Sequence, residues 1–98
     1  MILVRDIFQL KFGKSRDAVA LWKKGKSILQ STAHKPVRLL TDLTGPYYTL
    51  VLESEFANLA EFESGHTTTA VTDEWRRWYS RFTELVESGR REIFTIVE

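Results

Sequence analysis

The sequence contains no cysteine and only two histidines among its 98 residues. Without cysteine the chain forms no disulfide bond and offers no thiolate to a metal ion, and a reducing cytoplasm is compatible with it. An excess of one charge is also missing, since 14 lysines and arginines nearly balance 13 aspartates and glutamates and leave a net charge of +1. A dedicated nucleic-acid-binding domain normally has a basic excess, so nucleic acid is not an expected partner.

Long apolar runs are missing as well. No run approaches the roughly 18 residues that a membrane span needs. The apolar opening at residues 1–4 meets Arg5 and Asp6 at once and is too short for the core of a signal peptide. We therefore expect a cytoplasmic protein with no membrane partner. The length predicts one domain over residues 1–98, with the modest stability of a small chain that gains from association.

The motifs of several enzyme classes are absent. No second histidine lies three or four residues from His34 or His66, and no pair of acids has ligand spacing, so no metal site is expected. The chain also lacks a nucleophile elbow, a phosphate-binding loop and a dinucleotide fingerprint. Ser64, Gly65 and His66 are merely consecutive, and adjacency in sequence does not make a catalytic triad.

The strongest pattern present is an amphipathic helix near the C-terminus. Thr72 is expected to cap it, Gly89 to end it, and a last strand to follow over 92–97. Asp73 is expected to lie within reach of Arg77 on its surface. Two indoles on one helical stripe need a broad apolar partner, which a sheet supplies most simply. The apolar residues at helical spacing are Trp75, Trp78, Phe82, Leu85 and Val86.

The segments before this helix alternate between strand and helix patterns. Residues 2–12 predict a strand whose apolar face is broken by Asp6, which we place at a sheet end. Ser15 is expected to cap the next helix, where Gly25 costs about 1 kcal/mol relative to alanine and close packing would explain its presence. Asn58 and Glu61 resemble a capping box that opens a short helix, with the end of that helix and a linker expected over 65–69.

Two further strands, 37–42 and 47–53, form a predicted hairpin around residues 44–46. Pairing Asp42 with Tyr47 puts both on one face of the sheet, and the opposite face must meet the helices. The order strand, helix, strand, strand, helix pair, strand predicts an α+β ferredoxin-like βαββαβ fold with a four-stranded antiparallel sheet and helices on one face. The uncovered face is too apolar to leave wet, so we expect a homodimer through Leu3, Ile7, Leu40, Tyr47 and Val51.

Several stretches resemble NIPSNAP-like proteins. The opening strand RDIFQLKFGK over 5–14 carries the Leu-Lys-x-Gly-Lys close of those proteins, Trp22 fits the middle of their first helix, and DEW over 73–75 and ELVESGRREI over 84–93 fit their C-terminal part. The sequence differs in having Phe12 where a proline is common and in its linker over 67–69. The resemblance implies the dimeric α+β barrel superfamily, in which two ferredoxin-like protomers pack sheet to sheet. That superfamily includes haem-degrading and cofactor-free monooxygenases, isomerases, peroxidase relatives and ligand-sensing domains.

The resemblance implies a small organic molecule bound or transformed in the cleft between helices and sheet, by a cofactor-independent monooxygenase or isomerase. The alternative is a non-catalytic structural or interaction homodimer, and the sequence does not decide whether the chain is an enzyme. His66 is the catalytic candidate, or else a polar linker residue. No cofactor is expected. Haem is the alternative, because His66, Asn58 and Trp75 resemble a histidine, an asparagine and a tryptophan of the haem-degrading relatives. Candidates for the pocket, or else simply for the core, are Trp22, Tyr48, Asn58 and Trp75.

A second polar group lies on the expected sheet-to-sheet face. Its charges would set the register of a dimer, at a desolvation cost that good geometry must offset. Alternatively, they would bind an anionic or phenolic small molecule. The members of this group are Arg5, Arg38, Asp42, Tyr47, Val51 and Glu53.

Overall fold

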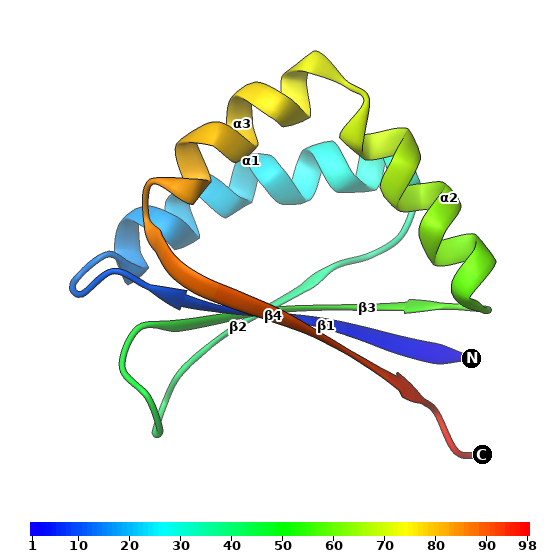
Figure 1. Cartoon of the computed structure of the whole chain (residues 1–98), viewed down its shortest axis with the longest axis horizontal. Helices are drawn as coiled ribbons and strands as arrows, with labels where there is room; N and C mark the ends of the chain where they lie inside the picture. The colour runs from blue at the N-terminus through cyan, green and yellow to red at the C-terminus, as the bar shows by residue number, and fades with distance from the viewer.

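The computed structural model describes all residues, 1–98, in two layers: a sheet and three helices that cover one of its faces (Figure 1). The four strands are antiparallel in the order β2-β3-β1-β4. The predicted ferredoxin-like fold is therefore confirmed. The elements are β1 (Ile2–Leu10), α1 (Ser15–Ala33), β2 (Arg38–Thr41), β3 (Thr49–Phe56), α2 (Leu59–Ala70), α3 (Asp73–Thr83) and β4 (Val86–Thr95).

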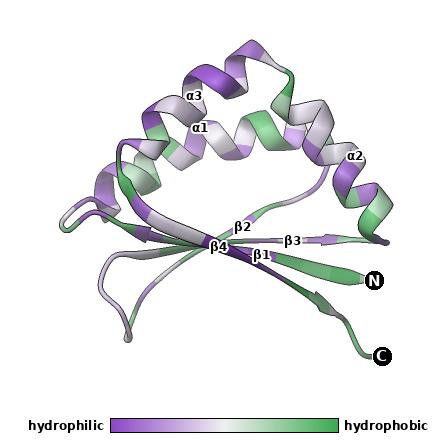
Figure 2. Cartoon of the chain, in the orientation of Figure 1, coloured by the Kyte–Doolittle hydropathy of each residue, from purple (hydrophilic) through white to green (hydrophobic).

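The hydrophobic core lies between the sheet and the pair α1 and α3. Trp78 and Phe82 of α3 are buried, as the helical stripe predicts, and the Trp78 indole Nε1 donates to the carbonyl of Leu21 at 2.7 Å. Most other positions of α3 are hydrophilic (Figure 2), so this helix is held by its inner edge. Buried residues of the cluster are Leu10, Ala18, Trp22, Ile28, Val37, Leu50, Leu52, Trp78 and Phe82.

Gly25 explains how closely α3 approaches α1. A Cβ atom at this position would lie 2.3 Å from Cζ2 of Trp78, well inside van der Waals contact. The expected close packing at Gly25 is confirmed, and the indole ring takes the space that any side chain would need.

The predicted end of α3 is wrong. The helix ends at Thr83, and Val86 already begins β4, so Leu85 and Val86 are not on the helical stripe. Gly89 is not a helix stop but lies within β4 opposite Phe8, where a Cβ would be 3.0 Å from the Phe8 ring. The last strand thus starts earlier than residue 92, because the full length of β1 offers it hydrogen bonds that local sequence does not reveal.

The predicted helix end and linker over 65–69 are also wrong, because these residues, including the threonines 67–69, lie inside α2. The hydroxyls of Thr68 and Thr69 donate to the carbonyls of Ser64 and Gly65, at 2.9 Å and 3.1 Å. Thr69 also shares a 2.6 Å hydrogen bond with the hydroxyl of Thr32 on α1. The hydroxyls of these threonines are thus hydrogen-bonded within α2, and Thr69 also joins α2 to α1. A prediction that treats consecutive threonines as a break in the helix does not anticipate these bonds.

The expected helix caps have mixed outcomes. Asn58 accepts from the amide of Glu61 at 2.9 Å and Thr72 from the amide of Trp75 at 3.3 Å, as predicted. Ser15 is not a cap, since Lys14 holds that position without a side-chain hydrogen bond.

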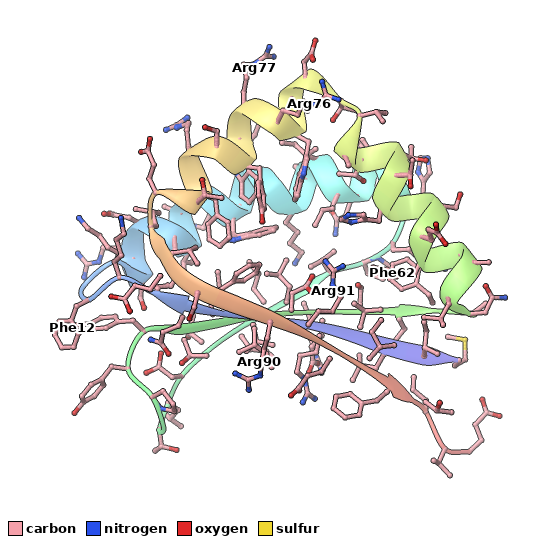
Figure 3. All side chains as sticks on the ribbon, in the orientation of Figure 1. Phe12, Phe62, Arg76, Arg77, Arg90 and Arg91 are labelled. Carbon is pink, nitrogen blue, oxygen red and sulfur yellow. The ribbon has the colours of Figure 1, made fainter.

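Two other expected pairings are corrected. Asp73 lies 3.9 Å from Arg76 and not beside Arg77, which points away from the domain (Figure 3). In the hairpin, Asp42 pairs with Thr49 and not with Tyr47: Asp42 N donates to the Thr49 carbonyl at 3.3 Å, and Thr49 N donates to Asp42 Oδ1 at 3.0 Å. The shift is by two residues, so the predicted faces of the strands are preserved.

Candidate functional site

A cavity of about 350 Å³ lies between the helices and the sheet. Its walls come from all three helices and from β1, β3 and β4, and most of its lining is apolar or aromatic. A few polar side chains enter it from opposite sides: Asp6 and Arg91 from the sheet, and His66 from α2. The aromatic lining residues are Phe8, Trp22, Phe56, Phe62, Trp75 and Tyr79.

Asp6 and Arg91 form an ion pair on the sheet side of the cavity. They are direct neighbours on β1 and β4, with Arg91 Nε 2.5 Å from Oδ1 and Nη2 3.4 Å from Oδ2 of Asp6. The guanidinium also lies 5.0 Å from the centre of the Phe62 ring. Figure 3 shows Arg91 on the helix side of the sheet with Phe62, while its neighbour Arg90 leaves from the opposite face.

The sequence prediction missed this pair. Asp6 was expected at a sheet end but lies in the middle of β1, with partners on both sides in β3 and β4. The signal in the sequence is Asp6 itself, a carboxylate that interrupts the apolar face between Val4 and Phe8, on the side that must meet the helices. A charge at such a position needs an opposite charge beside it, but only the register reveals that this partner is Arg91.

His66 stands on the helix side of the cavity. It lies in α2, is exposed to solvent, and its ring centre is 5.9 Å from that of Phe62. Lys35 also lines the cavity but is held by Glu61, with Nζ 2.6 Å from Oε1. The hydrogen bond from Lys35, aided by one from the Ala57 amide, lowers the pKa of Glu61 below its usual range. Both cations of the lining, Lys35 and Arg91, are therefore neutralised by carboxylates.

The structure brings three of the five predicted cavity residues together. His66, Trp22 and Trp75 line the cavity, with the two indole rings 6.1 Å apart. Asn58 does not line it and serves as the N-cap of α2. Tyr48 is also outside, at the other end of the sheet, where its ring packs 4.7 Å from that of Phe12.

Solved structures with this arrangement of helices and sheet point to one fold. An uncharacterised NIPSNAP domain protein from Burkholderia xenovorans has a TM-score of 0.90 at 13% identity, over 99% of this chain and 95% of its own. A NIPSNAP family protein from Agrobacterium tumefaciens has a TM-score of 0.92 at 18% identity, over 99% and 93%. The chain has the NIPSNAP fold. The family resemblance predicted from sequence is thus confirmed at the level of fold.

The fold of this chain is also similar to that of an oxygenase. SnoaB, a cofactor-independent oxygenase from Streptomyces nogalater, has a TM-score of 0.75 at 9% identity, over 99% of this chain and 93% of its own. The sequence itself matches no family model and no curated protein. At these identities the likeness carries the fold and not an activity.

The outer face of this NIPSNAP sheet holds the predicted polar group. Glu53 is only 6% exposed and receives Arg5 Nε at 2.9 Å and Arg38 Nη2 at 2.5 Å. The hydrogen bond from Arg38, followed by that from Arg5, holds the pKa of Glu53 below its usual range, and Glu53 raises the pKa of Arg38. Val51 lies beside this cluster, whereas Asp42 and Tyr47 belong to the hairpin end, where Tyr47 is largely exposed.

Side chains that could ligate a metal ion are not clustered in the structure. No group of three or more histidine, aspartate or glutamate side chains is arranged to hold a metal ion.

Membrane-spanning helices are not found in the structure, since none of its helices is both long and apolar enough to cross a bilayer.

Proposed function

We propose that the cavity binds a small, planar, largely apolar organic molecule that carries a carbonyl or hydroxyl group. The observation that carries this proposal is a single cavity in which aromatic walls meet the Asp6–Arg91 pair and His66. Its volume of about 350 Å³ lies within the range of small-molecule sites, which combine apolar linings with a few placed polar groups. Trp22, Phe62 and Trp75 supply flat faces for stacking.

Arg91 supports recognition of a ligand oxygen. A guanidinium has five N–H donors, and the pair with Asp6 engages only Nε and Nη2. The remaining donors are available to a carbonyl oxygen or to the oxyanion that forms from it. Asp6 fixes the orientation of the Arg91 guanidinium and balances its charge. The site therefore favours a neutral ligand over a strong anion.

The reaction class that follows is proton transfer without a bound cofactor. His66 is the only histidine of the lining, and histidine is the side chain that most often acts as a general base. It takes a proton from the carbon next to the ligand carbonyl, and the electron pair of that C–H bond moves onto the oxygen beside Arg91. Return of the proton to another carbon is the isomerase outcome. In the monooxygenase outcome the carbanion reduces dioxygen and, with the proton, forms a hydroperoxide, whose O–O bond then breaks with loss of water and leaves one oxygen on that carbon as a carbonyl. The oxygenase fold of SnoaB supports this assignment.

Exchange of acidic hydrogens in β-tetralone, a planar bicyclic ketone, tests this chemistry. In heavy water the protein is expected to accelerate replacement of the α-hydrogens by deuterium, followed by proton NMR. His66→Asn should slow the protein-dependent exchange about 100-fold or more, because the base is lost.

His34→Asn is the matched control for this experiment. His34 is exposed at the end of α1 with a positive φ of 56°, a conformation that asparagine tolerates, and it does not line the cavity. The His34→Asn variant should leave the exchange rate unchanged. Equal rates for the two variants would remove His66 from the reaction, and no acceleration by the unaltered protein would remove the reaction itself.

We also propose that the outer face of the sheet is a homodimer interface. This proposal applies whether the protein is an enzyme or purely structural. Ile7, Val51 and Leu40 are neighbours across three strands on this face, and Leu40 is 38% exposed. No helix covers them, since all three helices lie on the other face (Figure 1). Burial by a second copy would remove this apolar row from water.

Replacing Val51 with glutamate should convert the proposed dimer to a monomer, since an unpaired charge would be buried in the apolar row. Val71→Glu is the matched control, because Val71 is 61% exposed at the end of α2 on the helix side. A sizing column coupled to light scattering gives the mass of each variant. An unchanged dimer of the Val51 variant would exclude the outer face as its interface.

A further inference from the structure

Three indoles pack together beside the cavity, and one of them has an unused hydrogen-bond donor. Trp22 lines the cavity, and its Nε1 is the only buried side-chain nitrogen or oxygen atom of the chain without a hydrogen-bond partner. Its neighbour Trp78, in contrast, donates from Nε1 to the carbonyl of Leu21. A buried N–H group without an acceptor costs free energy, so native proteins rarely keep one without a reason.

The protein around Trp22 supplies rings and no acceptor oxygen for this N–H group. The rings of Trp75, Trp78 and Phe82 meet the Trp22 indole edge to face, with centres at 6.1 Å, 4.3 Å and 5.2 Å. The cavity is the space beside the indole that an oxygen atom from outside the chain enters, in a water molecule or in a ligand.

The polar groups of the cavity lie at different depths. The side chain of Arg91 is 41% exposed, and His66 is exposed as well. Trp22 is 2% exposed and belongs to the core cluster together with Phe82. The lining thus runs from a polar end near the surface to an aromatic end inside the domain. A ligand whose carbonyl lies beside Arg91 directs the remote end of its ring system toward Trp22.

We propose that the indole N–H of Trp22 is a second recognition group of the cavity and binds an oxygen at the inner end of the ligand. This inference rests on the proposed function and narrows its ligand class. The ligand then carries an acceptor oxygen at each end of a planar ring system: the reacting carbonyl beside Arg91, and an ether or carbonyl oxygen beside Trp22. Trp22 binds and orients the ligand and takes no part in the proton transfer.

The chemistry of the indole restricts the group that it accepts. An indole nitrogen only donates, so the inner end of the ligand must offer an acceptor, and an ammonium group is excluded there. A carboxylate would lose its hydration in exchange for one neutral donor, which favours an uncharged oxygen. An apolar group at the same place would leave the donor unpaired and displace the water that satisfies it, so such a ligand binds more weakly.

Two ketones of nearly equal size test this inference. They are the methoxy and ethyl derivatives of β-tetralone, substituted on the aromatic ring at the position farthest from the ketone, and they differ by one oxygen in place of a methylene. In titration calorimetry the unaltered protein should bind the methoxy compound about fivefold more tightly, the size of one net hydrogen bond. Trp22→Phe keeps an aromatic ring and loses the donor, so the preference should disappear.

Trp75→Phe is the matched control for this comparison. Trp75 is also an indole of the lining, but its nitrogen is not a buried donor without a partner. The preference for the methoxy compound should therefore persist in this variant. If the unaltered protein binds both ketones equally, or if Trp22→Phe keeps the preference, the inference is wrong and the proposed function stands. If the unaltered protein binds neither ketone, the proposed function fails together with the inference.

The indole N–H signals in NMR keep the inference testable if Trp22→Phe does not fold. The isotope-labelled, unaltered protein has three such signals, one for each tryptophan. The methoxy compound should move the Trp22 N–H proton downfield relative to the ethyl compound, because a hydrogen bond to oxygen deshields the proton. The Trp78 signal should respond equally to both, since its N–H is already bound to Leu21. Equal responses of the Trp22 signal would contradict the inference, and an upfield Trp22 proton with both ketones would assign the donor to the face of a neighbouring ring.

Discussion

Replacing Trp78 with alanine should lower the free energy of unfolding by about 3–5 kcal/mol. The indole is 4% exposed, stacks with Phe82 at 5.5 Å between ring centres, and meets the Trp22 ring edge to face at 4.3 Å. Its removal leaves a void between α1 and α3 and leaves the Leu21 carbonyl without the indole hydrogen bond. Urea denaturation followed by circular dichroism measures the loss.

Tyr79→Ala is the comparison for this result. Tyr79 is the next residue of α3 and is also aromatic, but it is 40% exposed. It should therefore cost clearly less than Trp78. A loss below about 1 kcal/mol for Trp78→Ala would mean that α3 does not pack through this residue.

Gly25→Ala should destabilise the protein by about 1–3 kcal/mol, although alanine is the better helix former. In an exposed helix this change would gain about 1 kcal/mol. Here the added Cβ would lie 2.3 Å from the Trp78 ring, so that α3 or the indole must move. Denaturant melts of the single variant give the sign directly, and a gain in stability would contradict the packing.

A double-mutant cycle separates this clash from other effects of the substitution. In a Trp78→Ala background the obstacle is gone, so Gly25→Ala should be neutral or stabilising by up to about 1 kcal/mol. A loss of the same size in both backgrounds would assign the effect of Gly25 to something other than the indole.

The fold was accessible from sequence because its signals are local and periodic. Trp75, Trp78 and Phe82 repeat at helical spacing, and Thr72 marks the start of their helix. Alternation in β1 indicates a strand with one buried face, and Gly25 within a helix pointed to a close neighbour. Such patterns fix the order of the elements, and the order with right-handed crossovers leaves few topologies.

The end of α3 and the polar part of the cavity depend on pairing at long range. A glycine such as Gly89 is typical of the end of a helix. The structure explains it instead by the close approach of the Phe8 ring on β1, which leaves little room for a side chain. Asp6 and Arg91 are 85 residues apart, and only the register of β1 with β4 brings them together. His66 lies in the expected cleft, but the sequence predicts a linker at this position and the structure has a helix.

The cavity is the centre of the functional account, and occupancy by a ligand is its most direct test. Titration calorimetry with β-tetralone compares the unaltered protein with Ala70→Phe, which adds a ring to the cavity lining at the end of α2. Ala60→Phe makes the same change on the exposed surface of the same helix and does not touch the lining. We predict binding by the unaltered protein and by Ala60→Phe, with affinity lowered about tenfold or more by Ala70→Phe. Equal binding by all three proteins, or none by the unaltered one, would contradict the assignment of this cavity as the ligand site.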